Sequence, residues 1–134
     1  MGCVQTYEKY NLSKCTINNV SELSFEGQIM LCKVVEVYDG DTVTLCFKFL
    51  GKYFKKRCRL LGINAPEIRT KNLQEKEKGF NSKNYLYSIL QDKIVTFDCK
   101  GYDKYGRLLG TIYLNGKNIN QELLDKGFAV KYVI

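Results

Sequence analysis

The sequence predicts an α+β domain made mainly of β-strands, in which five strands close into a small barrel, with one helix after the third strand and another after the fifth. Short runs of β-branched and apolar residues, bounded by Gly, Asn and Asp, recur between residues 28 and 114 and indicate the strands. A stretch with apolar residues at i, i+3 and i+4 interrupts these runs and indicates a helix. The 134 residues suffice for one core and are too few for two comfortable domains.

The first three predicted strands are joined by short turns. The run from Gln28 to Tyr38 ends at Asp39-Gly40, which is among the strongest short hairpin signals. Residues 42–49 then alternate clearly, with Val43, Leu45, Phe47 and Phe49 on the apolar face and Thr42, Thr44, Cys46 and Lys48 on the other. A turn containing Gly51 leads into a third strand from Tyr53 to Leu61.

A helix, two strands and a second helix complete the prediction. The polar segment from Ile68 to Lys78 is expected to be a mobile loop, and it runs into a helix that ends near Gln91 and buries a stripe of Leu86, Ile89 and Leu90. Strands are expected at residues 93–99 and 107–114. A short helix is expected from Asn118 to Lys126, with Asn118 as N-cap, Gln121 at the capping-box position and Gly127 as the C-terminal stop.

The predicted order of elements is three strands, a helix, two strands and a helix. Five-stranded meanders with a helix after the third strand commonly close into a barrel of the OB type, a fold that also binds oligonucleotides. Residues 1–26 are rich in Asn, Ser and Thr and are expected to form an N-terminal tether. The barrel domain is therefore expected to span residues 27–134.

The charge balance favours a polyanionic partner. A formal net charge of +7 and a pI near 9.1 are typical of proteins that bind nucleic acid or an anionic membrane surface, although an ordinary basic protein has the same composition. The chain contains no histidine, which excludes imidazole catalysis and zinc sites that need imidazole. Hydrolysis by this chain would have to use carboxylate, water, metal and arginine.

The six cysteines are scattered and form no C-x-x-C pair. Four of them stand within apolar strand-like runs, where a thiol acts as a small hydrophobic side chain. No secretory signal and no apolar run long enough to span a membrane is present in the sequence. We therefore expect an intracellular, cytoplasmic location with reduced thiols.

Carboxylates and guanidiniums stand where the barrel could bring them together. Asp41 follows a tight turn, and Glu67 lies in the loop after the third strand. Arg57 and Arg59 lie on one face of that third strand. Hard divalent ions such as Ca²⁺ take carboxylate, amide and backbone oxygens, so Asp41, the Asn64 side chain and the Ala65 carbonyl are candidate ligands. Arginine is the residue suited to bidentate contacts with phosphate, although a solvated surface arginine is an equally simple reading of Arg59 and Arg107.

Three motifs in this order resemble the staphylococcal nuclease family. The resemblance runs from about Val34 to Lys131 and rests on a D-G-D-T turn at residues 39–42, an R-L-L-x-x-x-x-P-E segment at residues 59–67 and a D-K-Y-G-R segment at residues 103–107. The resemblance implies an OB-fold barrel and Ca²⁺-dependent hydrolysis of DNA and RNA, preferably single-stranded, to 3′-phosphorylated products.

The resemblance also implies a role for each matching position. Arg59 and Arg107 match the two catalytic arginines, and Glu67 matches the glutamate that positions or deprotonates the attacking water. The implied metal ligands are Asp41, the residue at position 64 and the backbone carbonyl of Ala65. Lys104 and Tyr105 match residues that contact the substrate phosphate. Asn64 departs from the family, which usually has an aspartate there, so we expect weaker Ca²⁺ binding because affinity depends on ligand charge.

The N-terminal sequence carries a separate signal. Residues 1–6, M-G-C-V-Q-T, match the N-myristoylation pattern at Gly2, and Cys3 stands beside it as a candidate palmitoylation site. Two acyl chains would give stable membrane attachment, whereas one gives only marginal binding. Chance agreement with a permissive six-residue pattern is the competing explanation.

Two further functions compete with the nuclease. In the first, the chain resembles the degenerate repeats of Tudor staphylococcal nuclease proteins, in which lost catalytic residues leave a module that binds nucleic acid or protein. Asn64 favours this reading, and the intact Arg59 and Arg107 oppose it. In the second, the chain is a membrane-tethered adaptor with a vestigial site.

Overall fold

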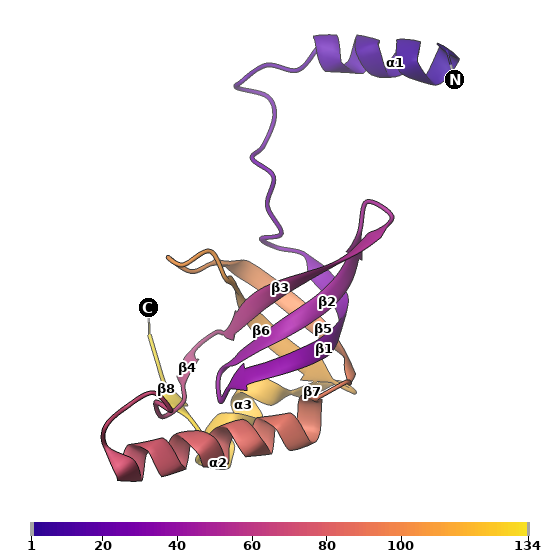
Figure 1. The fold of residues 1–134 in the computed structure, drawn as a ribbon. Helices are drawn as coiled ribbons and strands as arrows, with labels where there is room; N and C mark the ends of the chain where they lie inside the picture. The colour runs from indigo at the N-terminus through magenta and orange to yellow at the C-terminus, as the bar shows by residue number, and fades with distance from the viewer. Residues whose placement is uncertain (1, 134) are drawn as a thin grey trace.

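Five long strands form a closed barrel in the computed structural model, which describes residues 2–133 (Figure 1). The strands are β1 (Ile29–Asp39), β2 (Thr42–Phe49), β3 (Lys52–Leu60), β5 (Ile94–Tyr102) and β6 (Leu108–Leu114). Their order in the sheet is β3-β2-β1-β5-β6, and pairing of β3 with β6 closes the barrel. The predicted five-stranded barrel of the OB type is confirmed.

The closing pair is the one parallel contact among the five long strands of the described chain. Each of the other neighbouring pairs is antiparallel. Because an odd number of alternating strands brings two strands of the same direction together at the seam, β3 and β6 must run parallel, with Arg59 opposite Leu109. The seam therefore places the end of β3 beside the start of β6.

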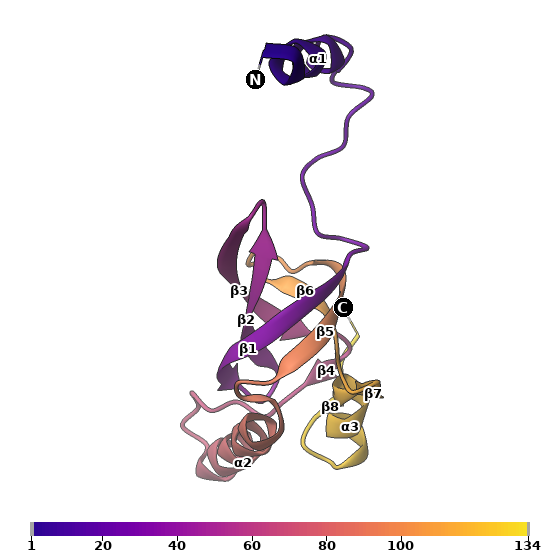
Figure 2. The ribbon, with the colours of Figure 1, turned by 90° about the vertical axis from the view of Figure 1, so that its right-hand side faces the viewer.

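Two helices pack on the barrel, and the longer one begins earlier than predicted. Helix α2 (Leu73–Leu90) crosses one end of the barrel and buries Leu86 and Leu90, as expected (Figures 1 and 2). Its N-cap is Asn72, whose side-chain oxygen accepts hydrogen bonds from the backbone N–H groups of residues 74 and 75 at 3.1 Å. The predicted loop from Ile68 to Lys78 is therefore too long, because a strong cap starts the helix within the polar segment.

The second helix, α3 (Ile119–Asp125), is capped as predicted at both ends but without a reciprocal capping box. The Asn118 side chain accepts from the Gln121 N–H at 3.0 Å. The Gln121 side chain instead donates to Asp125, one turn later, at 2.8 Å. At the other end Gly127 has φ +78°, and Phe128 N–H bonds the Leu123 carbonyl at 2.9 Å, which is the pattern of a Schellman cap.

The barrel interior contains three of the four residues that the alternation predicted, and the fourth, Phe49, is half-buried against the core. Val43, Leu45 and Phe47 are buried. On the opposite face of β2, Thr42 and Thr44 are buried as well, and their hydroxyls donate to Asp41 in the hairpin and to Glu36 in β1. Cys32, Cys58 and Cys99 are buried free thiols, in agreement with a packing role.

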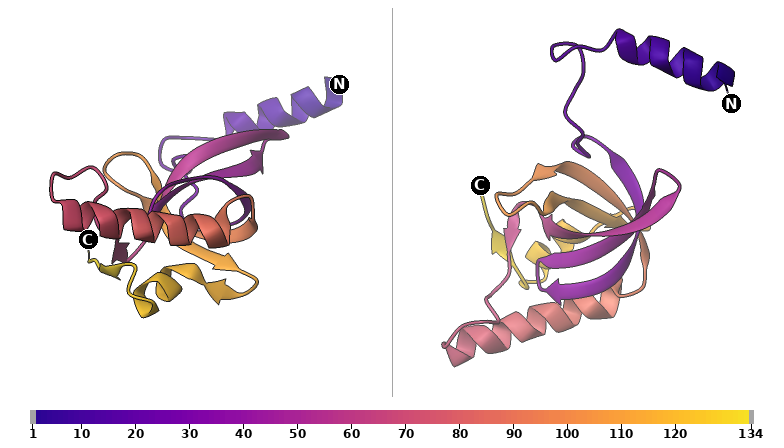
Figure 3. Two further views of the ribbon diagram at one scale, coloured as in Figure 1. Left: turned by 60° about the horizontal axis from the view of Figure 1, so that its bottom comes forward. Right: turned by 45° about the horizontal axis from the view of Figure 1, so that its top comes forward.

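Three two-residue strands lie outside the long strands. They are β4 (Ile63–Asn64), β7 (Lys117–Asn118) and β8 (Val130–Lys131). β4 pairs with β8, so Asn64 stands opposite Val130 and the C-terminal segment lies beside the loop after β3 (Figure 3). This pairing fixes the backbone of a segment that the sequence indicates only as a loop.

The N-terminal segment contains a helix that is not predicted. Helix α1 (Gly2–Ser13) lies apart from the barrel at the end of an extended linker (Figures 1 and 3). From Phe25 onward the chain packs on the barrel, where the Phe25 ring meets the Phe47 ring edge-on at 5.4 Å. Cys3 is exposed on α1, and acylation of Gly2 and Cys3 stays a prediction. Among residues 2–133, no helix is long and apolar enough to cross a membrane.

Candidate active site

One polar cavity gathers most of the predicted site residues. The cavity has a volume of about 670 Å³ and lies between the β1–β2 hairpin, the loop after β4 and the loop before β6. Its lining includes Asp41, Arg59, Asn64, Glu67, Tyr105 and Arg107. A larger cavity of about 850 Å³ lies where the linker meets β1 and β2, but its lining contains neither arginine nor carboxylate. The chemistry that the sequence predicts therefore belongs to the smaller cavity.

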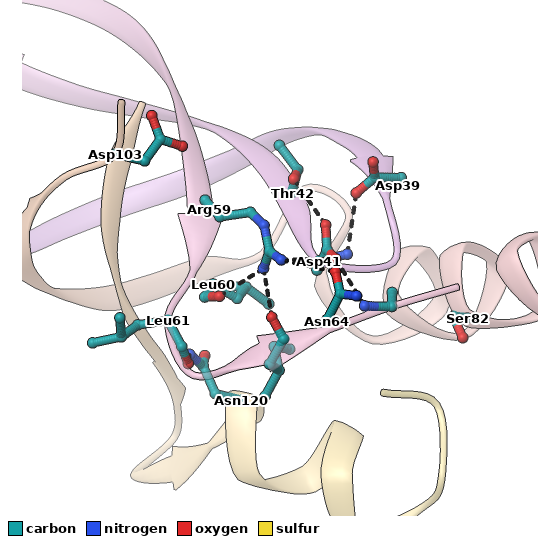
Figure 4. Close-up of polar contacts among 12 residues, drawn as sticks. Asp39, Asp41, Thr42, Arg59, Leu60, Leu61, Asn64, Ser82, Asp103 and Asn120 are labelled. Carbon is teal, nitrogen blue, oxygen red and sulfur yellow. Dashed lines mark hydrogen bonds and ion pairs between the residues drawn. The ribbon is translucent and has the colours of Figure 1, made fainter. Parts of the chain in front are cut away.

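Asp41 is a buried carboxylate at the tip of the first hairpin. Its Oδ2 accepts the Ala65 N–H at 2.8 Å, and its Oδ1 accepts the Thr42 hydroxyl at 3.0 Å (Figure 4). Burial, and to a smaller extent the neighbouring Asp39, raises the pKa of Asp41 to about 6, although Arg59 and the Ala65 N–H act in the opposite direction. The carboxylate therefore carries a charge that its protein partners compensate only in part.

Glycine at position 40 allows the hairpin to approach the rest of the site. A Cβ atom at this position would lie 2.8 Å from the Cβ atoms of both Ala65 and Ser82. Contacts this short are not tolerated, so the turn could not sit against the loop and α2 with a larger residue. Gly40 does not have a positive φ, and its role is close packing.

Arg59 is held at the centre of the site by several acceptors. Its Nη1 donates to the backbone carbonyls of Leu60 and Ile63 at 2.9 and 2.8 Å (Figure 4). Its Nη2 donates to Asn64 Oδ1 at 3.2 Å and lies 3.3 Å from Asp41 Oδ2. Only 12% of the side chain is exposed, so the guanidinium is oriented by the protein and screened from solvent.

Asn120 ties together the two chain segments that carry the predicted catalytic arginines. This buried side chain on α3 lies beside Leu61, to whose carbonyl it donates at 2.9 Å (Figure 4). It also donates to the carbonyl of Gly110 at 3.1 Å. Its oxygen accepts the Ile112 N–H at 3.2 Å. The exit of β3 and the middle of β6 are thus fixed relative to each other by a satisfied polar group, which strengthens the seam of the barrel.

Arg107 is oriented by the loop that precedes it. Asp103 Oδ1 accepts the N–H groups of Tyr105 and Arg107 at 2.9 Å, and Asp103 Oδ2 accepts the Arg107 Nε–H at 2.5 Å. Burial acts to raise the pKa of Asp103, but these hydrogen bonds outweigh it, so the pKa lies below its usual value. The ring of Tyr105 lies 5.4 Å from the Arg107 guanidinium and 5.2 Å from the Lys104 ammonium. Lys104 lines a neighbouring cavity of about 410 Å³ that shares Arg59, Tyr105 and Arg107 with the polar cavity.

The loop after β4 presents the remaining predicted residues. Glu67 is exposed and lines the polar cavity. Ala65 is buried and contacts Asp41 through its N–H. Gly79 of α2 packs beneath this loop, where a Cβ atom would lie 2.8 Å from the carbonyl oxygen of Pro66. Helix α2 therefore supports the loop from below and sets the position of Glu67.

The oxygen donors at this site are of the type that a hard divalent cation prefers, but they are few. Asp39 and Asp41 adjoin each other, and Asn64 and Glu67 line the same cavity. Within residues 2–133, no group of three or more His, Cys, Asp or Glu side chains is arranged to hold a metal ion. The pKa of Asp41 is raised by burial and by the adjacent Asp39, and a bound cation would offset both effects. The donor set thus fits a weakly held cation with oxygen ligands.

Several residues of the cavity are not predicted as site residues from the sequence. They are Tyr38, Asp39, Lys56, Arg57 and Arg69. The sequence contains four arginines, and all four line this one cavity. The shared face of Arg57 and Arg59 on β3 is a signal that could have identified Arg57, whereas Arg69 comes from a loop whose path the sequence does not specify.

The fold and the cavity define a class of protein: an OB-type barrel with a cationic cavity suited to phosphate groups. The chain belongs to the staphylococcal nuclease homologue family, whose model matches residues 57–134. An uncharacterized endonuclease of Haemophilus influenzae is 37% identical over 101 residues, which cover 75% of this chain and 52% of that protein. An uncharacterized protein of Methanocaldococcus jannaschii is 35% identical over 125 residues, which cover 75% of this chain and 58% of that protein.

A third relative shows the same domain within a longer protein. Endonuclease YhcR of Bacillus subtilis is 36% identical over 110 residues, which cover 75% of this chain and only 9% of that protein. The chain spans about half the length of the first two relatives. Family membership and fold are therefore shown, in agreement with the resemblance seen in the sequence.

Proposed function

We propose that this protein is a metal-dependent nuclease that hydrolyses phosphodiester bonds in DNA and RNA. The observation that carries the proposal is the convergence of Arg59, Arg107 and Glu67 on one cavity beside the Asp41 carboxylate. These three groups are what a phosphodiester hydrolysis without histidine requires: two fixed cations for the phosphate and one carboxylate for the water. Relatives named as endonucleases support the same reaction class.

The roles follow from the charge that develops during the reaction. Attack of water on phosphorus increases the negative charge on the phosphate oxygens, and the guanidiniums of Arg59 and Arg107 meet that charge. Both guanidiniums are already oriented by hydrogen bonds, so little reorganisation is needed when the charge forms. Glu67 positions the attacking water or takes its proton. Lys104 and Tyr105 bind the substrate phosphate from the neighbouring loop.

The proposed cofactor is Ca²⁺, held by Asp41, Asn64 and the Ala65 carbonyl. When bound, the ion would stabilise charge on a phosphate oxygen. Asp39 adds a second carboxylate next to Asp41 that the sequence-based ligand set does not include. Because Asn64 brings no charge, the affinity for Ca²⁺ is expected to be lower than in family members with an aspartate at this position.

Single-stranded substrates fit the site best. Tyr105 lines the cavity and is exposed, so it offers an aromatic face among the cationic side chains. Unstacked bases and phosphates of a single strand are recognised by such a combination of aromatic rings and positive charge. The proposed products carry a 3′-phosphate, which follows from the family resemblance.

A direct assay tests the proposed function. Single-stranded DNA and RNA are incubated with the protein in Ca²⁺, with a chelator in one control and with Glu67→Gln in another. We expect cleavage in Ca²⁺ that the chelator abolishes and that Glu67→Gln reduces by 10²-fold to 10⁴-fold, the usual range for acid–base assistance. Circular dichroism of the variant checks that it is folded. No Ca²⁺-dependent cleavage by the wild-type protein would rule out the nuclease.

The second candidate is a catalytically weak or inactive module that binds nucleic acid or protein. Asn64 and the small number of carboxylates in the cavity favour it. The two candidates differ in one measurement, because a binding module would retain an oligonucleotide in the presence of chelator and leave it intact in Ca²⁺.

Attachment and location are also proposals. All six cysteines are free thiols, which supports an intracellular, cytoplasmic protein. Cys3 on the outlying α1 is accessible for palmitoylation, and Gly2 would carry the myristoyl group. Mass spectrometry of the N-terminus from the native host decides between an acylated Gly2 and an unmodified Met1, and the latter would exclude membrane attachment by this route.

A further inference from the structure

Two of the four arginines in the cavity have no role in the proposed reaction. Arg59 and Arg107 flank the reacting phosphate, whereas Arg57 and Arg69 lie at the Tyr38 side of the same cavity. The cavity lining contains five cationic side chains and three carboxylates, while the chain's other sixteen lysines lie outside it. Arginine is thus concentrated at this cavity, and arginine is the side chain suited to planar, bidentate contacts with phosphate.

Arg57 and Arg69 stack against one aromatic ring. The guanidinium carbon of Arg57 lies 3.9 Å from the centroid of the Tyr38 ring, and that of Arg69 lies 4.6 Å from it. Stacking on an aromatic face is favourable for a guanidinium and leaves the N–H groups at its edge free. Tyr38 therefore brings together two cations that would otherwise repel each other.

The carboxylates near these arginines do not occupy their donors. Arg57 Nη2 lies 3.8 Å from Glu36 Oε1, and Arg69 Nη2 lies 3.6 Å from Asp39 Oδ2. Both distances are too long for hydrogen bonds. Thr44 donates to the same Glu36 oxygen at 2.9 Å, which holds that carboxylate in place. In contrast, Arg59 donates to three acceptors and Arg107 to Asp103. Among the described residues, Arg57 and Arg69 thus keep exposed donors at the cavity wall.

The strand geometry sets the spacing between the two pairs of arginines. Arg57 and Arg59 are two residues apart on one face of β3, and β2 holds them in register opposite Thr44 and Thr42. Two residues of a strand span roughly 6.5 to 7 Å. That separation is of the order of the distance between neighbouring phosphates along an extended single strand. The wall of the cavity is therefore suited to two consecutive phosphates.

We propose that Tyr38, Arg57 and Arg69 form a second phosphate-binding subsite, which holds a phosphate next to the scissile one in a single-stranded polynucleotide. Arg57 and Arg69 contact this phosphate, and Tyr38 is a positioning residue that orients both guanidiniums. The inference rests on the proposed function, since it assigns the substrate class of that same cavity. It implies that the protein acts on oligonucleotides and polynucleotides in preference to dinucleotides, whose single phosphate cannot occupy both subsites.

Oligonucleotide binding provides the test, with cleavage suppressed by Glu67→Gln in all variants. Binding of fluorescein-labelled oligothymidylates with two and with eight nucleotides is measured by fluorescence anisotropy at several salt concentrations. We expect Arg57→Gln and Arg69→Gln each to weaken binding of the octamer by about tenfold, in line with a hydrogen bond to a charged group. The slope of log affinity against log salt should fall by about 0.7, as for one lost phosphate contact on a single strand. The dinucleotide should lose less than the octamer.

Two other sites provide matched controls. Lys33 matches Arg57. The Lys33 side chain is 48% exposed and its Nζ lies 4.0 Å from an oxygen of Asp92, whereas the Arg57 side chain is 44% exposed and lies 3.8 Å from an oxygen of Glu36. The Lys100 side chain is 55% exposed and pairs with Asp98, which matches the 57% exposure of Arg69. Lys33→Gln and Lys100→Gln remove the same charge outside the cavity and should weaken binding much less. Arg57→Lys keeps the charge, but its affinity for the octamer should fall nearly as far as that of Arg57→Gln, because an ammonium lacks the planar arrangement of donors of a guanidinium.

The outcomes separate this inference from the proposed function. If Arg57→Gln and Arg69→Gln lose no more affinity and no more salt dependence than the lysine controls, the second subsite is wrong, whether or not the wild type cleaves DNA. If Arg57→Lys binds as the wild type does, charge alone is responsible and the bidentate contact is wrong. If the wild type fails to cleave in Ca²⁺ while the arginine variants still lose binding of the octamer, the proposed reaction fails and the subsite stands.

Discussion

Substitution of Asn64 by aspartate is the sharpest test of the proposed cation site. Asn64 Oδ1 accepts a hydrogen bond from Arg59 Nη2 at 3.2 Å, and the same nitrogen lies 3.3 Å from Asp41 Oδ2. Asn64→Asp would place a second negative charge beside Asp41 without changing the size of the side chain. Two cations would then compete for the new carboxylate: the guanidinium of Arg59 and the divalent ion.

The structure allows the attraction of the new carboxylate to Arg59 to be compared with its attraction to the divalent ion. A full charge 3.2 Å from the guanidinium would gain about 5 kcal/mol of Coulomb energy at an effective dielectric constant near 20. Desolvation of the new carboxylate cancels most of this gain, and the existing bond already has a charged donor, so the change stays within the range of about 1.5 to 3 kcal/mol that such bonds span. The contact with Arg59 should therefore strengthen by about 1 kcal/mol. A doubly charged ion at a similar distance gains twice the Coulomb energy, so we expect the ion to gain more than Arg59 does.

The expected result is a Ca²⁺ requirement that falls by about tenfold, which corresponds to about 1.4 kcal/mol. The Ca²⁺ concentration for half-maximal cleavage is measured for wild type and variant, and calorimetric titration of Ca²⁺ separates binding from catalysis. Asn118→Asp is the matched control, because it adds the same charge at the N-cap of α3, where aspartate serves as well as asparagine. An unchanged or raised requirement in Asn64→Asp would show that residue 64 is not a ligand.

Three further predictions concern the arginines, the hairpin and Asp41. Arg59→Ala and Arg107→Ala should each lower kcat by about 10²-fold to 10³-fold, as for a lost oxyanion donor, and steady-state kinetics on single-stranded DNA would contradict this if kcat stayed within tenfold. Gly40→Ala should lower the free energy of unfolding by about 1 to 3 kcal/mol, because its methyl group would overlap two side chains; urea unfolding measures this, and wild-type stability would refute the close approach. The pKa of Asp41 is raised from 3.8 in the unfolded chain to about 6 in the folded protein. Without Ca²⁺, the folded state therefore binds more protons than the unfolded state at pH values between these two. Stability should then fall by up to about 3 kcal/mol as pH rises from 4 to 6, and Asp41→Asn should remove this dependence.

Most of the barrel is predictable from local patterns. Residues 42–49 alternate clearly enough to identify Val43, Leu45 and Phe47 as the inward face of β2, and Asn118 and Gly127 mark both ends of α3. One error, the start of α2, arises because a side chain can bond to nearby backbone groups. Asn72 starts α2 within a polar segment that resembles a loop, because one amide oxygen satisfies two backbone N–H groups.

The site is predictable in part, and the missing part has a physical cause. Asp41, Arg59, Glu67 and Arg107 stand in motifs that are recognisable in the sequence, and the structure places all four on one cavity. Arg69 carries no comparable signal, because its position depends on the path of the loop after β4. That path is set by pairing of β4 with β8 and by the support of Gly79, both of which are distant in sequence.

The sequence by itself determined the order of the five barrel strands and of the two helices that pack on them, most residues of the barrel core and the types of group available for chemistry. Side-chain period and turn residues are local properties, so they can be read without the fold. The tertiary structure decided which groups meet. Closure of β3 on β6, the tie through Asn120 and the close approach at Gly40 bring Arg57, Arg59 and Arg107 to one cavity, and the pairing of β4 with β8 adds Arg69. Contacts between segments far apart in the chain depend on packing, and packing becomes defined only when the barrel closes.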